Sequence, residues 1–204
     1  GSITFSNGAA SFTLGGSSIL LGTGITNSDD SIHQVNLNLG LTGATTFTGS
    51  VAAGGIIVGG NVTGSAAATL SHTLTLGGTS TNNRITGSIS DGTGGGTVAL
   101  VKAGTGKWEL ATANTYTGGT TLNAGDVGVV LVTHASALGT GDVTINNATS
   151  GTIRNGRVQL ANDIALTGPS KFTLNGRSTH TQIENLSGNN SYAGDIIIAG
   201  QEGR

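Results

Sequence analysis

Three aspartates are the residues of this sequence whose spacing comes nearest to a catalytic arrangement. Asp126 and Asp142 lie 16 positions apart, and Asp142 and Asp163 lie 21 apart, so successive units of a stacked repeat could bring them together. Two carboxylates about 5 to 10 Å apart can cleave a glycosidic bond. However, Asp126 and Asp142 each follow a glycine at a turn-like position, where aspartate is common for conformational reasons. We therefore expect no catalytic residue in this chain.

Residues that could ligate a metal are scattered along the sequence. Asp29 and Asp30 form one adjacent pair, whereas calcium takes about six to eight oxygen ligands, so we interpret the pair as a solvated turn. The chain has no cysteine, and none of its four histidines is spaced to share a metal with another. These histidines, which we expect on exposed loops or strand faces, are His33, His72, His134 and His180. The sequence predicts no metal site and no cofactor.

Composition and charge exclude several other classes of protein. The 204 residues carry a net charge of −2 with a sequence pI near 6.0, which gives no basic footprint for nucleic acid or for an anionic membrane. No apolar run exceeds five residues, far short of the ~20 that a membrane span needs. Gly, Thr, Ser and Asn make up 105 residues, and the last three compete with helical hydrogen bonding. We expect no nucleic-acid partner, no membrane insertion and no significant helix.

Apolar and polar residues alternate with period two from end to end of the chain. Such runs predict short strands that bury one face and expose a face of Thr, Asn and Ser. The clearest runs are residues 3–5, 12–14, 35–41, 74–76, 143–145, 172–174 and 196–198. Glycines and Asn-Gly pairs, which favour tight turns, lie between them. The chain is therefore predicted to be all-β.

Two features favour a β-solenoid over a β-sandwich. Phe, Trp and Tyr make up only 3% of the residues, too few for the thick core between two packed sheets, whereas aliphatic side chains can fill a narrow coil. In addition, residues 114–118 recur with substitutions at 190–194, and such repeats indicate stacked units. We expect a single domain over residues 1–204, a parallel β-helix of about eight to ten coils with roughly 20 to 25 residues each.

Residues 102–145 resemble the autotransporter-associated β-strand repeat of bacterial passenger domains, and residues 190–200 are a weaker second copy. The resemblance implies a right-handed parallel β-helix that is exported to the bacterial cell surface or secreted. It also implies structural roles, in strands, ring packing and tight corners, for the residues that match. These residues are Gly104, Gly106, Trp108, Asn114, Tyr116, Gly118, Gly119, Gly125 and Tyr192.

Three classes of function stay open on these observations. The first is a non-catalytic structural solenoid outside the cell that assembles into fibres. The second is an adhesin or glycan-binding passenger, for which Trp108 is the obvious ring to stack on a sugar. The third is a carbohydrate-active enzyme. Exposed aromatics in a groove would favour the second class, and carboxylates clustered on adjacent coils would favour the third.

The two ends of the predicted solenoid lack the usual caps. Soluble solenoids normally protect their terminal strand edges with a helix, proline or charge. Residues 1–83 contain no Lys or Arg, and residues 196–198 are three consecutive isoleucines. The strand of Ile3 and Phe5 and the strand of Ile196 and Ile198 are therefore candidate assembly edges. We expect them to pair end to end between copies, or to be continued by the coils of a longer parent chain.

Overall fold

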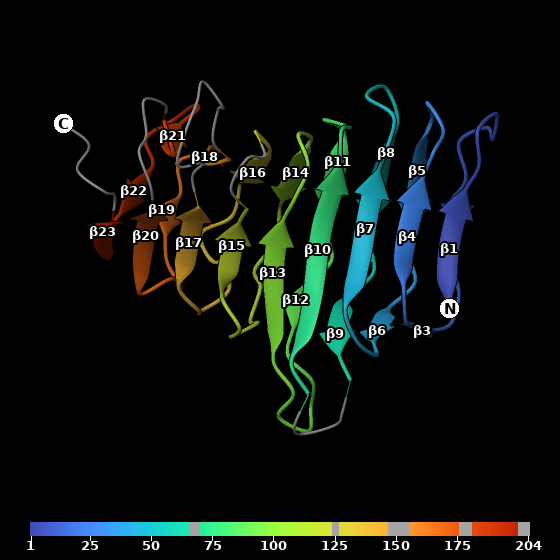
Figure 1. Ribbon diagram of the computed structural model, residues 1–204, viewed down its shortest axis with the longest axis horizontal. Helices are drawn as coiled ribbons and strands as arrows, with labels where there is room; N and C mark the ends of the chain where they lie inside the picture. Colours follow the sequence, from blue (N-terminus) through green and yellow to red (C-terminus); the bar gives the residue numbers. More distant parts are fainter. Residues whose placement is uncertain (66–69, 124–126, 147–155, 176–180, 200–204) are drawn as a thin grey trace.

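The computed structural model describes residues 1–65, 70–123, 127–146, 156–175 and 181–199, and within them the chain forms 23 strands and no helix. Every strand pairs in parallel with its neighbours in a sheet (Figure 1). No helix in the described residues could cross a membrane. The predicted all-β parallel β-helix is confirmed.

The strands form two long sheets and two short ones. The first sheet, in spatial order, contains β1 (Ser2–Phe5), β4 (Gly24–Asn27), β7 (Thr45–Gly49), β10 (His72–Gly78), β13 (Val98–Lys102), β15 (Thr120–Leu122), β17 (Val143–Asn146), β20 (Lys171–Asn175) and β23 (Asp195–Ala199). The second contains β2 (Thr13–Leu14), β5 (Ile32–Val35), β8 (Gly55–Val58), β11 (Asn83–Ile85), β14 (Lys107–Leu110), β16 (Val129–Val132), β18 (Arg157–Leu160) and β21 (Ile183–Asn185). The third contains β12 (Ile89–Ser90), β9 (Val62–Gly64), β6 (Leu39–Leu41) and β3 (Ile19–Leu21), and the fourth pairs β19 (Ala165–Leu166) with β22 (Ser191–Tyr192).

The solenoid has about seven turns, fewer than the eight to ten coils that the sequence predicts. Coil length explains the difference. The coil from Leu100 to its partner Thr120 spans 20 residues, whereas the coil from Val143 to its partner Phe172 spans 29. Longer segments at the corners therefore add residues to a coil without adding another coil to the solenoid.

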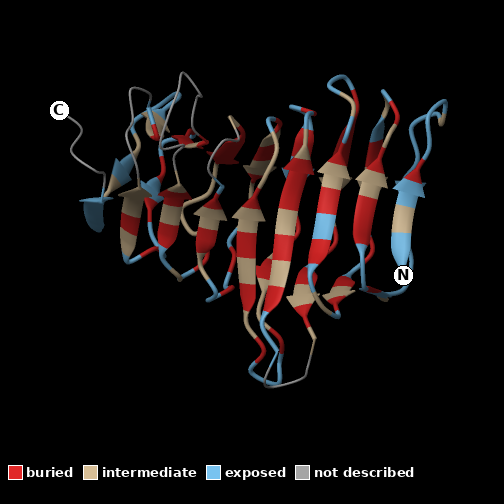
Figure 2. Cartoon of the chain, viewed as in Figure 1, coloured by how far each residue is buried: buried red, intermediate tan, exposed pale blue. Residues whose placement is uncertain are grey.

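Alternation along each strand builds columns of inward side chains that run the length of the solenoid. Strands β10 and β13 show the pattern clearly, with buried and half-buried residues in turn (Figure 2). One inward column of the first sheet, followed through the strand pairings, is Ile3, Ile25, Phe47, Leu76, Lys102, Leu122, Ile145, Leu174 and Ile198. Most of the column is apolar, so hydrophobic burial holds each coil against the next.

The alternating run at residues 35–41 is not one strand. It divides into the end of β5 and β6, with a corner at residues 36–38 between them. Leu37 remains buried at this corner, so the period of two continues through a change of direction. The prediction of a single strand here is wrong because hydrophobic alternation does not distinguish a strand from a corner that also buries one side chain.

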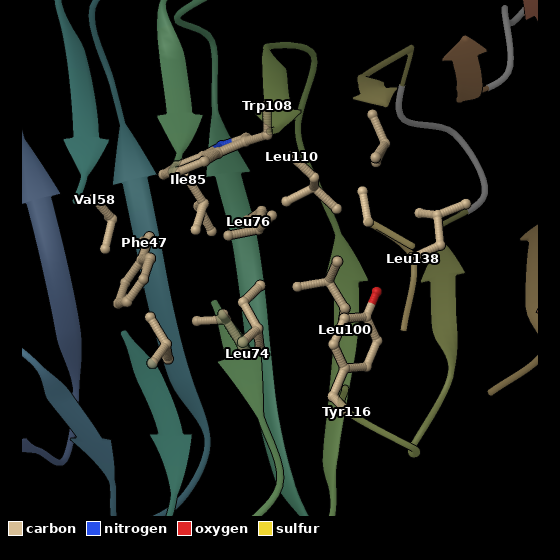
Figure 3. Close-up of a cluster of buried hydrophobic side chains, with 14 of the residues drawn as sticks. Phe47, Val58, Leu74, Leu76, Ile85, Leu100, Trp108, Leu110, Tyr116 and Leu138 are labelled. Carbon is tan, nitrogen blue, oxygen red and sulfur yellow. The ribbon is translucent and has the colours of Figure 1, made fainter. Parts of the chain in front are cut away.

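The third side of the solenoid is built from strands in the first coils and from irregular segments in the middle coils. Strands β3, β6, β9 and β12 form it in the first coils. Between β12 and β19 none of the described residues forms a strand on this side, and buried side chains such as Tyr116 and Leu138 fill the space (Figure 3). The change coincides with the region that resembles the passenger repeat.

Candidate functional site

Trp108 lies in the core of the solenoid. Its side chain, carried by β14, is fully buried beside Phe47, with ring centroids 6.3 Å apart (Figure 3). The indole Nε1–H donates a hydrogen bond to the carbonyl oxygen of Gly77 on the preceding coil at 2.9 Å. The ring is thus fully used in packing, and it offers no face on which a sugar could stack.

Asn114 and Tyr116 hold the strandless third side together. The Asn114 amide lies between two coils, because its Oδ1 accepts from the backbone N–H of Ile89 at 2.7 Å and its Nδ2 donates to the carbonyl of Ala137. The buried hydroxyl of Tyr116 forms a 2.6 Å hydrogen bond with Oγ1 of Thr120. Burial raises the pKa of the Tyr116 phenol. The Asn114 amide thus adds to the backbone hydrogen bonds that still join the coils on this side, such as that from the N–H of Thr115 to the carbonyl of Ile89 at 2.9 Å.

The second copy of the motif places its residues in the same way. Oδ1 of Asn190 accepts from the backbone N–H of Ile164 on the preceding coil at 2.9 Å, as Asn114 does with Ile89. The Tyr192 ring meets Phe172 edge to face at 4.9 Å, and its hydroxyl donates to the carbonyl of Pro169 at 3.3 Å. Tyr192 is only partly buried because β22 lies near the last coil. The asparagine Oδ1 bond to the preceding coil is therefore the same in both copies, whereas the two tyrosine hydroxyls have different partners.

The glycines of the motif lie where coils approach too closely for a side chain. Gly104 has a φ of +68°, and a Cβ there would lie 2.6 Å from the carbonyl oxygen of Gly78. At Gly106, a Cβ would overlap the carbonyl of Ser80. Gly118 and Gly119 lie at the turn before β15, and Gly125 lies outside the described residues.

Comparison with protein families finds segments that overlap residues 102–145 and 190–200. The family model described as passenger-associated-transport-repeat matches residues 100–129 and 185–200. Two segments of the chain thus match this repeat. Nothing among the curated proteins matches the chain, and no solved structure matches it either. The two matched segments hold both copies of the Asn and Tyr motif, so the resemblance seen in the sequence is confirmed.

Asp29 and His33 form a buried polar pair outside the repeats. Both side chains are inaccessible to solvent, and Oδ1 of Asp29 lies 3.4 Å from Nε2 of His33. The His33 ring stacks on Phe5 at 4.2 Å, almost parallel. The interpretation of residues 29 and 30 as a solvated turn is wrong for Asp29 and right for Asp30, which is exposed. The error arises because a residue at a corner can turn its side chain inward.

The other histidines divide between the core and the surface. His72 is fully buried, and Nε2 of its ring lies 3.2 Å from the backbone nitrogen of Ser65. The expectation of exposed histidines is therefore wrong for both His33 and His72. His134 is half-buried, and Nδ1 of its ring accepts a hydrogen bond from the backbone N–H of Ser136 at 3.1 Å. His180 lies outside the described residues. Within the described parts of the chain, no group of three or more His, Cys, Asp and Glu residues could hold a metal.

The aspartates spaced for catalysis have separate partners. Asp142 forms an exposed ion pair with Lys171 at 3.2 Å. Asp163 accepts a hydrogen bond from the backbone N–H of Asn189 at 2.7 Å, in a turn where its own φ is +54°. Asp126 lies outside the described residues. Both described carboxylates thus bind groups of the neighbouring coil, as structural residues of a solenoid do.

The two terminal strands of the first sheet differ in exposure. On β1, Phe5 is buried and Ile3 is half-buried. All five residues of β23 are exposed, including Ile196 at 53%, Ile197 at 43% and Ile198 at 79% (Figure 2). This strand pairs on one side with β20 and has no partner on the other among the described residues. Among the described residues, no other strand carries as many exposed large apolar side chains as β23.

Proposed function

We propose that this chain is a non-catalytic structural segment of a secreted or surface-exposed bacterial passenger protein. The passenger-associated transport repeats support a passenger-type domain and a location outside the cell. The observation that carries the structural role is the use of the motif side chains. Trp108, Asn114 and Tyr116 all bond to other parts of the solenoid wall, so the repeat stiffens the rod.

The exposed β23 strand supports a further part of this proposal, which is end-to-end assembly. Three adjacent isoleucines on a strand with one free edge are a template for another strand. The inward column that ends at Ile198 begins at Ile3. A ladder that continues without a break therefore places Ile3 of a second copy beside Ile198 of the first. Such a head-to-tail contact repeats without closing and gives an open filament.

Light scattering and electron microscopy of the 204-residue chain test this assembly. The N–H of Asp195 donates to the carbonyl of Ser170, the residue before β20, so by alternation the N–H of Ile198 faces the free edge of β23. Proline at Thr4 or at Ile198 removes a backbone donor from the proposed junction, so each variant should reduce particle length and mass at high protein concentration. Proline at Ile57, which lies within the interior strand β8, should instead unfold the rod and serves as a control for folding defects. A monodisperse monomer at high concentration, or assembly that both edge variants leave unchanged, would show that the edges are not assembly sites between copies.

A further inference from the structure

A groove lies on the outer face of the third sheet, in the first half of the solenoid. It has a volume of about 440 Å³ and is lined by β3, β6 and β9, by the residue before each of these strands, and by Ser65 and Thr93. This volume falls within the range of about 300 to 1,000 Å³ that small-molecule sites occupy. The lining includes Leu20, Asn38, Gly40, Asn61 and Thr63.

The floor of the groove is apolar and open because of Gly40. Leu20 is 68% exposed, and a Cβ on Gly40 would lie 2.7 Å from its Cδ2 atom. The Leu20 side chain thus lies flat across the next coil, and any larger residue at position 40 would push it away. The result is an exposed apolar strip along the sheet.

Two amide groups of fixed orientation stand beside this strip. Oδ1 of Asn38 accepts from the backbone N–H of Asn61 at 2.9 Å, and Oδ1 of Asn61 accepts from the backbone N–H of Ser88 at 3.1 Å. Each bond holds the oxygen against the wall, so the Nδ2 group of the same amide faces away from it. Neither Nδ2 group has a protein partner in the described part of the chain. The two groups lie one coil apart, about 4.8 Å.

The groove favours an uncharged ligand. All of its lining residues are uncharged, and the only formally charged side chains in residues 1–83 are Asp29, which is buried, and Asp30. An extended peptide would need free backbone groups to bind as an added strand. Here β6 pairs with β3 on one side and with β9 on the other, so its backbone groups are already used. Along β6 and β9, which are paired at both edges, side chains alone are left for recognition.

We propose that this groove binds a neutral oligosaccharide. Sugar rings present C–H groups on their faces and hydroxyls at their edges, and these match the Leu20 strip and the two amide donors. The Thr63 hydroxyl accepts a hydrogen bond from Oγ of Ser90 at 3.3 Å, which leaves its proton to donate to a sugar hydroxyl. Because no aromatic ring lines the groove, binding is weak, with a Kd of about 1 mM. The proposal is independent of the β1 and β23 edges, so it can fail while end-to-end assembly holds.

Saturation-transfer NMR with neutral gluco-, manno- and xylo-oligosaccharides tests the groove, and titration gives the Kd. We expect at least one of them to bind, and Asn38→Ala, Asn61→Ala and Leu20→Ala each to weaken it by about fivefold or more. Asn36→Ala is the matched control. Its Oδ1 also accepts a side-chain hydrogen bond, from Nε2 of Gln34 at 2.9 Å, on the same coil but outside the groove.

Melting curves by circular dichroism establish that each variant folds. Leu20→Ala removes an exposed side chain that makes no hydrogen bond, so it remains informative if an asparagine variant unfolds. Absence of saturation transfer to every sugar would overturn the proposal. So would binding that all three groove variants leave unchanged, or binding of an extended peptide in place of the sugars.

Discussion

Oδ1 of Asp29 lies 3.4 Å from Nε2 of His33, and both side chains are buried, Asp29 at the corner after β4 and His33 on β5. Nδ1 of His33 accepts from the backbone N–H of Phe12 at 3.2 Å, so the ring proton of the neutral form is on Nε2, toward the carboxylate. Oδ2 of Asp29 accepts from the backbone N–H of Gly8 at 2.8 Å. The pair therefore fastens the turn of the first coil to the second coil.

Stability should depend on the charge of Asp29. Burial acts to raise the pKa of this carboxyl, but hydrogen bonds from Ser31, Gly8 and His33 outweigh it and lower the pKa below the ordinary 3.8. A group with a lowered pKa stabilises the folded state above its unfolded pKa, and this contribution is lost as the pH falls through the folded pKa. Asp29→Asn should therefore reduce the melting temperature at pH 7, with the difference shrinking below about pH 4.

Thermal melts of both proteins between pH 3 and pH 8 measure this dependence. Asp30→Asn is the matched control, because Asp30 is the exposed neighbour on the same corner. It should leave the melting temperature unchanged throughout. A difference between Asp29→Asn and the unmodified protein that is equally large at pH 3 would contradict the role of the carboxylate charge.

Trp108 should be the most sensitive single position in the core. Trp108→Ala removes a fully buried ring and its bond to Gly77, and we expect it to lower the free energy of unfolding by about 3 to 5 kcal/mol. Trp108→Phe keeps most of the ring volume and should cost less. Denaturant unfolding followed by circular dichroism gives both values. Leu186→Ala, at a side chain that is 49% exposed, should change the free energy by less than about 0.5 kcal/mol.

Asn114 should contribute more to stability than its equivalent Asn190. Asn114→Ala leaves the N–H of Ile89 and the carbonyl of Ala137 without their side-chain partner in a buried setting, at a cost of about 1 to 3 kcal/mol for each group. Asn190 is half-buried, so water can replace part of what Asn190→Ala removes. The denaturation midpoint of Asn114→Ala should therefore be lower than that of Asn190→Ala. Equal midpoints would show that the hydrogen bonds of Asn114 between coils are not what stabilises the repeat.

Substitution of Asp142 should affect neither catalysis nor stability appreciably. Its ion pair with Lys171 is about half exposed on both sides, and exposed pairs contribute about 0 to 1 kcal/mol. A screen against plant and bacterial polysaccharides should detect no turnover by the unmodified chain. Turnover that Asp142→Asn abolished would contradict the structural role and identify the protein as an enzyme.

Alternation in the sequence predicts the strands well because a two-residue period determines which side chains face inward. Phe47, between Thr46 and Thr48, is a clear case. The same rule places Lys102 in an inward column between Leu76 and Leu122, although lysine is rarely buried. Its Nζ donates to the carbonyls of Ala103 and Gly104 at the adjacent corner, and the sequence gives no sign that corner carbonyls lie within reach.

The polar corners are the part of the fold that the sequence does not reveal. Asp29 and His33 are four residues apart, a spacing with no meaning for a strand, and only the corner between β4 and β5 brings them together. The groove beside Asn38 and Asn61 escapes prediction for the same reason. Its two amides are 23 positions apart, and the lengths of the coils decide that they are neighbours.

Parallel pairing between neighbouring coils has a consequence for how the rod forms. Each strand between β1 and β23 in the first sheet pairs with the strand of the coil before it and that of the coil after it, so the last strand of any folded stretch can pair with the next length of chain. The free energy of adding one coil is then a local quantity that is gained stepwise. A chain of this kind can grow from one end while the rest is still extended, and its final shape does not require distant segments to find each other.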